Sequence, residues 1–139
     1  MKTVPQILKD SKTIAIVGLS TNAQRASHGV AHYLQQHGYR IVPVNPTYAG
    51  QEILGEKVYA SLQEAADALA VGGARIDIVD CFRKGEEMLP VARDAVAVRA
   101  GCLWMQMGVL NQGAADLASA AGLDVVMDQC IKVQHAAIQ

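Results

Sequence analysis

The sequence is poor in aromatic residues and contains no cysteine motif of the kind that binds zinc. Phenylalanine, tryptophan and tyrosine together make up 4% of the 139 residues, so aliphatic side chains and alanine must build the core. The three cysteines, Cys81, Cys102 and Cys130, are odd in number and far apart, and no C-x-x-C motif occurs. This pattern disfavours both a disulfide framework and a structural metal site.

An excess of one charge and a long apolar run are also absent. The chain has 12 Lys and Arg residues against 13 Asp and Glu residues, and no basic block occurs. A nucleic-acid partner is therefore disfavoured, because binding to the phosphate backbone requires a basic face. No apolar run approaches the ~20 residues of a membrane helix, and the N-terminal run is too short for a signal peptide. We expect a soluble cytoplasmic domain with no membrane partner.

Apolar residues, by contrast, are abundant and fall into short runs. They make up 51% of the chain, which is enough to bury a core without disulfides or metal. The length is that of one ordinary domain, and we expect a single domain over residues 1–139. Amphipathic segments between the runs predict helices, two of them capped by Ser61 and Asn111. The runs, interpreted as strands, cover residues 13–18, 39–44, 57–60, 75–80, 102–106 and 124–128.

The alternation of strands and helices predicts an α/β fold, a three-layer Rossmann-like doubly wound parallel sheet with right-handed crossovers. The apolar runs lack polar alternation, as is typical of strands buried on both faces. The third run is short and weak, which suits an edge and gives the strand order 3-2-1-4-5-6. Strands one and four are then neighbours, and a ligand is expected beside them at the carboxyl ends of the strands. The helix after the fourth strand is expected to begin near Pro90.

The first strand is followed by the loop GLSTNAQRAS, which lacks the dinucleotide fingerprint G-x-G-x-x-G. Gly18 occupies the first glycine position, but Ser20 and Ala23 occupy the other two. Gly18 allows the backbone to approach a ligand closely, and Arg25 supplies a positive charge. Ser27 is predicted to cap the next helix, whose N-terminus favours anions. The loop therefore predicts a phosphate or pyrophosphate site, with a plain surface loop as the alternative.

A second group of residues is expected to line the same crevice. Phe82 and Arg83 end the fourth strand, and Asn45 and Pro46 end the second. Arg83 could hold a phosphate or an amide carbonyl, or it could pair with one of the glutamates that follow it. The second strand ends without the acidic residue that holds the ribose of NAD, so dinucleotide binding ranks second.

Further candidates follow the last two strands. Trp104 is the only tryptophan, and we expect it to pack in the core with its indole N–H satisfied. Gln106 is a polar residue at the carboxyl end of a strand, where packing gives no reason for it. Cys130 follows the last strand, and either an inert buried thiol or a mixed disulfide with a ligand thiol is open there.

These segments together resemble the small CoA-binding domain family, which is similar to the CoA-binding domain of the succinyl-CoA synthetase α subunit. The matching segments are IAIVGLS with RAS, HYLQQHGYRIVPVNP, LGEKVYASL, DIVDCFR, LWMQMGV and AGLDVVMDQC, in family order over nearly the whole chain. The resemblance implies a Rossmann-like domain that binds coenzyme A or an acyl-CoA. It implies ligand contacts at Gly18, Leu19, Ser20, Asn22, Arg25, Ser27, Asn45, Pro46, Phe82, Arg83, Trp104, Gln106 and Gly108.

The chain departs from this family at two positions. The first loop contains TNAQ where relatives often carry Lys-Pro, and Gln129 stands where relatives often carry an arginine before the last cysteine. Both departures remove positive charge near the expected phosphates. Since a charge-assisted hydrogen bond contributes about 1.5–3 kcal/mol, we expect a weakened affinity for CoA.

No catalytic group is evident in the sequence. His28, His32 and His37 are expected on the solvated side of one helix and His135 in a solvated tail, and the chain has no room for a nucleotide-triphosphate domain. We therefore expect a non-catalytic or regulatory module that binds CoA. Two alternatives stay open: an NAD(P)-binding oxidoreductase or sensor, and a CoA-binding subunit of a split acyl-CoA synthetase. The expected partners are the CoA ligand and, under the second alternative, a synthetase-type subunit, with a homo-oligomer also left open.

Overall fold

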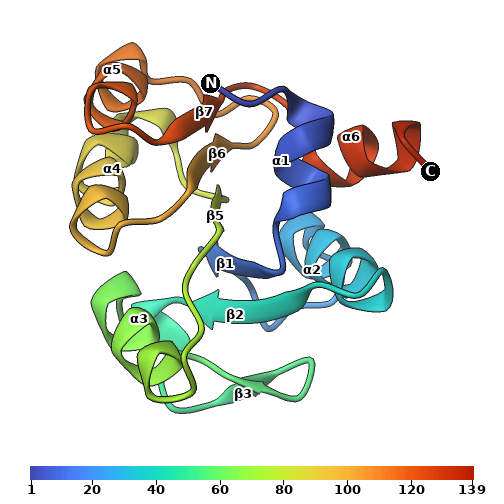
Figure 1. Ribbon diagram of the computed structural model, residues 1–139. Coiled ribbons are helices and arrows are strands. Elements are labelled where there is room, and N and C mark those ends of the chain that lie inside the picture. The colour runs from blue at the N-terminus through green and yellow to red at the C-terminus, as the bar shows by residue number, and fades with distance from the viewer.

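A central parallel sheet organises the molecule, whose computed structural model describes residues 1–139 (Figure 1). The strands lie in the order β2-β1-β5-β6-β7. All four pairings between neighbouring strands are parallel, so the carboxyl ends of the strands meet at one edge. The strands are β1 (Thr13–Val17), β2 (Arg40–Val44), β5 (Ile78–Cys81), β6 (Cys102–Met105) and β7 (Asp124–Val126).

Helices cover both faces of this sheet, which confirms the predicted three-layer α/β architecture (Figure 1). One face carries α1 (Val4–Asp10), α2 (Ala26–Gln36) and α6 (Ile131–Ala137). The opposite face carries α3 (Leu62–Val71), α4 (Met88–Ala97) and α5 (Gln112–Ala120). None of these helices has the length and continuous apolar character needed to cross a bilayer.

The predicted edge strand at residues 57–60 does not join the sheet as a regular strand. Its first part forms β4 (Glu56–Lys57), which pairs antiparallel with β3 (Glu52–Ile53), and only Tyr59 bridges to the sheet at Val44. The position of the third strand in the order 3-2-1-4-5-6 is therefore wrong, and the remaining order 2-1-4-5-6 is confirmed. The carbonyl of Pro43 accepts the Tyr59 N–H at this edge, but proline has no N–H with which to continue the ladder.

Two predicted boundaries also shift. The fourth predicted strand, β5, begins at Ile78 rather than at residue 75. Helix α4 begins at Met88, two residues before Pro90, because a short 3-10 helix, η2 (Gly85–Glu87), leads directly into it. Pro90 is tolerated in this first turn since a backbone N–H there would have no helical acceptor.

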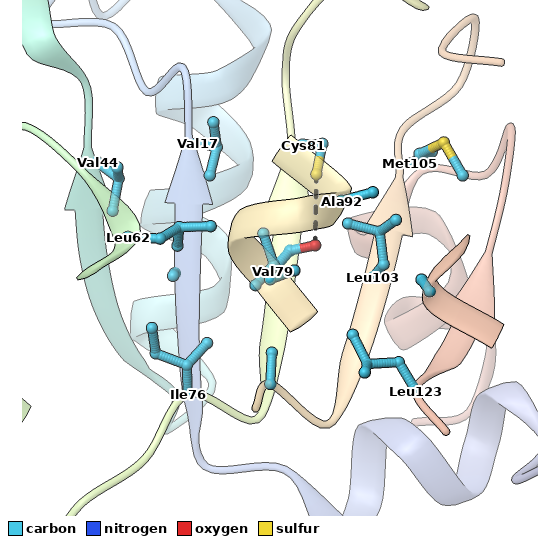
Figure 2. Packing of buried hydrophobic residues seen from close by; sticks show 14 of the residues in the cluster. Val17, Val44, Leu62, Ile76, Val79, Cys81, Ala92, Leu103, Met105 and Leu123 are labelled. Carbon is cyan, nitrogen blue, oxygen red and sulfur yellow. Dashed lines mark hydrogen bonds between the residues drawn. The ribbon is translucent and has the colours of Figure 1, made fainter. Parts of the chain in front are cut away.

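The core consists of two apolar clusters, one on each face of the sheet. Figure 2 shows part of the cluster under α4, where Val79 and Leu103 of neighbouring strands lie beneath Ala92. On the opposite face, Trp104 is completely buried, and its indole N–H donates to the carbonyl of Gln129 at 2.8 Å. This confirms the expectation that Trp104 packs in the core with its N–H satisfied.

The expectation that His135 is solvated is wrong. The side chain is buried between α6 and α2, and its Nδ1 lies 2.8 Å from the hydroxyl of Tyr33. Its ring also meets the edges of the His37 and Tyr39 rings. Burial, with a smaller effect of His37, lowers the pKa of His135 below the usual histidine value. The sequence did not indicate that the C-terminal segment forms a helix, α6, that packs against α1 and α2.

Candidate functional site

A cleft of about 740 Å³ opens at the carboxyl ends of the parallel strands, on the side of α2 and α6. It lies where β1 and β5 are neighbours, which is the predicted point of reversal in the strand order. Its size falls within the range of small-molecule sites, about 300–1,000 Å³. The predicted site residues that line it are Gly18, Ser20, Arg25, Ser27, Asn45, Phe82, Arg83 and Gln106.

Gly18 connects β1 to the loop that borders the cleft. Its φ of +88° is favourable only for glycine, and its N–H donates to the carbonyl of Val44 at 2.9 Å. A Cβ at this position would lie 2.5 Å from the carbonyl oxygen of Phe82. The loop therefore packs directly against the end of β5, and only glycine permits that contact.

The predicted cap at Ser27 is wrong, because α2 begins at Ala26 and Ser27 lies within its first turn. Arg25 is the N-cap and makes no side-chain capping hydrogen bond. The Ser27 hydroxyl is buried and instead accepts the N–H of Ser20 at 3.1 Å, a contact across the loop. The N–H groups of Ala26 and Ser27 have no acceptor within the chain, and both residues line the cleft. The first turn of α2 thus offers two free donors to an anion.

Positive charge is concentrated along this cleft. Arg25, Arg83 and Lys84 line it, whereas no Asp, Glu or His does. The guanidinium of Arg83 also lies 3.2 Å from a carboxylate oxygen of Glu87, so the alternative pairing with a following glutamate is present. Both side chains are more than one-third exposed, and such pairs contribute at most about 1 kcal/mol. A bound phosphate would therefore compete readily for Arg83.

Asn45 ties two of the bordering loops together. Its Nδ2 donates to the carbonyl of Leu19 at 3.1 Å, and its Oδ1 accepts the N–H of Thr47 at 3.0 Å. The side chain is 8% exposed, and these two hydrogen bonds use its amide donor and its amide acceptor within the fold. This cross-link holds the end of β2 against the loop after β1.

Gln106 has a packing role that the sequence did not reveal. The side chain is 5% exposed, and its Oε1 accepts the N–H of Ile131, the first residue of α6, at 3.1 Å. The expectation that packing gives no reason for a polar residue here is therefore wrong. The contact satisfies one N–H at the start of α6, which Cys130 precedes without a side-chain cap of its own.

Some predicted site residues lie outside the cleft, namely Leu19, Asn22, Pro46, Trp104 and Gly108. Leu19 and Trp104 are completely buried in the core, and Asn22 is exposed at the loop tip. Gly108 provides a turn with a φ of +84°. Pro46 lines a neighbouring cavity of about 520 Å³ between α3 and α4.

Several lining residues were missed by reasoning from the sequence. Lys84 follows Arg83 directly, so its position after the strand end was a usable signal. Tyr48 lies in η1 (Pro46–Tyr48), directly after the Asn45 turn. Met107 and Val133 are 67% and 55% exposed at the rim. Nothing in the sequence indicates that α6, which carries Val133, lies against this edge of the sheet.

An unpaired carboxyl group lies in the layer below the cleft. Asp80 pairs in register with Ile16 and Trp104, and it lies two residues before the cleft residue Phe82, which follows the end of β5. The side chain is completely buried, and neither carboxyl oxygen has a hydrogen-bond partner. Burial raises the pKa of Asp80 well above its usual range, which favours the neutral acid.

Asp80→Asn is expected to raise the free energy of unfolding at pH 8 and to change it little at pH 4. Below the unfolded-state pKa the carboxyl group is protonated in both states, so Asp80 carries no cost of ionisation. As the pH rises, only the unfolded state releases the proton easily, so the wild type loses stability until the folded-state pKa is passed. Urea unfolding from pH 4 to pH 8 measures this.

The matched control is Asp77→Asn on the same segment. The Asp77 carboxylate accepts the N–H groups of Lys12 and Thr13 at 2.8 and 3.0 Å, so its replacement should lower stability at pH 8. An Asp80→Asn variant that loses stability as the Asp77→Asn variant does would contradict an unpaired acid at Asp80.

The chain is similar to known proteins along almost its entire length. A family model described as a CoA binding domain matches residues 12–136. The "uncharacterized protein YneT" of Bacillus subtilis (strain 168) is 42% identical over 133 residues, which cover 96% of this chain and 92% of that protein.

Solved structures also resemble the chain over almost its entire length. "Cell-free ID.343" from Thermus thermophilus has a TM-score of 0.89 at 32% identity and covers 98% of this chain and 96% of its own. A hypothetical protein from Pyrococcus horikoshii OT3 has a TM-score of 0.84 at 34% identity, covering 96% and 88%. The Rex-family repressor RSP has a TM-score of 0.58 at 16% identity, which shows likeness of fold alone. The match over residues 12–136 and these relatives establish that the chain belongs to the CoA-binding domain family.

Proposed function

We propose that the chain binds coenzyme A or an acyl-CoA in the cleft on the α2 and α6 side, as a non-catalytic or regulatory module. The observation that carries this proposal is the composition of the cleft, which has three cationic side chains, free N–H groups of α2 and no carboxylate. Membership of the CoA-binding domain family supports the same ligand.

The cationic part of the cleft suits the phosphates of CoA. Arg25 and the free N–H groups of Ala26 and Ser27 border one segment of it, and Arg83 and Lys84 border another. CoA carries a pyrophosphate and a separate 3′-phosphate, so two groups of donors match two anionic groups. Fork-shaped guanidinium donors bind phosphate oxygens in pairs, which adds directional preference to the charge attraction.

The remaining wall of the cleft is apolar and suits a thin uncharged arm. Val30, Phe82, Val109 and Val133 supply aliphatic and aromatic surface, and Gln106 supplies one amide beside it. The pantetheine arm of CoA is an alkyl chain interrupted by amides, so it requires mainly apolar contact with few hydrogen bonds. No histidine or carboxylate, the side chains used most often in general acid–base catalysis, lines the cleft.

A dinucleotide is supported less well. A ribose of NAD is held by a carboxylate after the second strand, and here β2 is followed by Asn45, whose side chain is already bonded to Leu19 and Thr47. RSP has been crystallised in complex with β-NADH, but its 15% identity to this chain carries no ligand argument.

Thermal unfolding with CoA, acetyl-CoA, NADH and ATP, each measured separately, tests the proposal. A ligand at 100 times its Kd adds about 2.7 kcal/mol to the free energy of unfolding, so CoA should raise the Tm by about 5 °C or more. No shift with millimolar CoA or acetyl-CoA would refute the proposal. A shift with NADH alone would favour the dinucleotide alternative, and acyl-CoA synthesis only after addition of a ligase-type subunit would favour the split synthetase.

A further inference from the structure

Cys130 is the cysteine whose side chain reaches the cleft. Cys81 and Cys102 are buried in the core, whereas Cys130 is half-buried and lines the cleft wall. It directly precedes α6, and its side chain makes no capping hydrogen bond. The thiol is therefore free, and the residue lies between the core cluster of this face and the cleft.

Gln106 presents an unused donor to the same part of the cleft. The Ile131 N–H is a donor, so the end of the Gln106 amide that faces it must be the acceptor, Oε1. The other end of the amide is therefore the donor, Nε2. Nε2 has no partner within the chain. Only the Asp80 oxygens are both fully buried and without a partner, so the unpartnered Nε2 is not fully buried. Because Gln106 lines the cleft, Nε2 is accessible from the cleft.

This free donor points to a ligand acceptor next to Cys130. The side chain is 5% exposed and fixed at one end, so Nε2 can be reached only from the cleft. An occupant with a carbonyl oxygen would be held here by this fixed donor. Ile131, whose N–H orients the amide, is the residue after Cys130, so the carbonyl would lie close to the thiol.

We propose that this end of the cleft is a thiol–disulfide exchange site, at which Cys130 forms a mixed disulfide with the thiol arm of a phosphorylated ligand of the CoA type. The inference rests on the proposed function, because the phosphates of that ligand are held by Arg25, Arg83 and Lys84. The reacting species is the disulfide form of the ligand.

The exchange needs no other oxidant. The Cys130 thiolate attacks one sulfur of the ligand disulfide, the original S–S bond breaks, and a new S–S bond joins Cys130 to one ligand half. The other half leaves as a thiolate and takes up a proton. A free thiol reverses the reaction by attacking the mixed disulfide, so the modification reports the ratio of ligand disulfide to ligand thiol.

The other two cysteines cannot take part. Burial raises the pKa of both Cys81 and Cys102, which keeps these thiols protonated, and neither touches the cleft. They serve as internal controls in the wild-type protein.

Reduced protein treated with CoA disulfide, and in parallel with the uncharged hydroxyethyl disulfide, tests the proposal by intact-mass and peptide mass spectrometry. We expect one adduct, at Cys130, that forms at least about tenfold faster with CoA disulfide because binding concentrates it at the thiol. Excess 3′-phosphoadenosine 5′-phosphate should slow that reaction alone, dithiothreitol should remove the adduct, and Cys130→Ser should form none. Equal rates with both disulfides, or an adduct at Cys81 or Cys102, would overturn the proposal.

Gln106→Met tests the free donor separately. Methionine keeps the length of the side chain and adds no charge but loses Nε2, so the reaction with CoA disulfide should slow about fivefold or more while that with hydroxyethyl disulfide does not. Equal slowing of both reactions would remove Gln106 from the site, and a Tm measurement without ligand checks its folding. If CoA raises the Tm but no adduct forms, this inference fails and the proposed function stands; if CoA raises no Tm, the proposed function fails.

Discussion

Gly18→Ala is expected to lower the free energy of unfolding by about 3 kcal/mol or more. Two effects add. The residue has a φ of +88°, which disfavours any side chain, and the new Cβ would lie 2.5 Å from the Phe82 carbonyl oxygen. The contact is with backbone at the end of β5, so a rotamer change cannot relieve it. The loop or the strand end must move, and the cleft between them must change shape. Urea unfolding measures the loss.

Gly38→Ala is the matched control. Gly38 has nearly the same φ, +92°, but a Cβ there would have no neighbour within 4 Å. Its replacement should therefore cost only the backbone strain, about 1 kcal/mol. The difference between the two variants isolates the close approach of the loop to β5. Equal losses in both would mean that the Phe82 contact does not constrain Gly18.

Arg83→Ala is expected to weaken CoA binding by about 30-fold or more. Arg83 lines the cleft, and each charge-assisted hydrogen bond to a phosphate contributes about 1.5–3 kcal/mol. The free protein should change little in stability, since the exposed pair with Glu87 contributes at most about 1 kcal/mol. Calorimetric titration with CoA measures the affinity, and unfolding without ligand checks the fold.

Two control variants separate a contact from general charge. Glu87→Gln frees Arg83 from its carboxylate partner at 3.2 Å and should leave CoA affinity unchanged or raise it. Arg93→Ala removes an exposed arginine of α4 that does not line the cleft, and should have little effect. An Arg83→Ala variant that binds CoA as tightly as the wild type, or no more weakly than Arg93→Ala, would remove Arg83 from the proposed site.

Features that depend on nearby residues were predicted well from the sequence. Strand β1 is buried at every position, as its unbroken apolar run indicated, because both faces of a parallel sheet are covered. Ser61 and Asn111 cap α3 and α5 as predicted, since a capping side chain bonds to a backbone N–H only three residues away. The same rule was wrong for Ser27, because its hydroxyl is taken by Ser20 across the loop.

Errors arose where a distant segment competed with the local pattern. Residues 57–60 have an apolar character that suits an edge strand, but pairing with β3 and the missing N–H of Pro43 limit their contact with β2 to one bridge. His135 looked like a tail residue, but α6 packs against α1 and α2 and buries its side chain beside Tyr33. Neither outcome could be read from residues close in sequence.

The sequence alone determined the alternation of elements, the crevice beside β1 and β5, and the arginines at its border. These follow from runs and turns within short segments, and from the rule that parallel strands end at one edge. Only the tertiary structure decided that α6 lies against the cleft, that Gln106 keeps a free amide there, and that Asp80 stays unpaired beneath it. Each of these depends on packing between segments more than 20 residues apart, which no local pattern encodes.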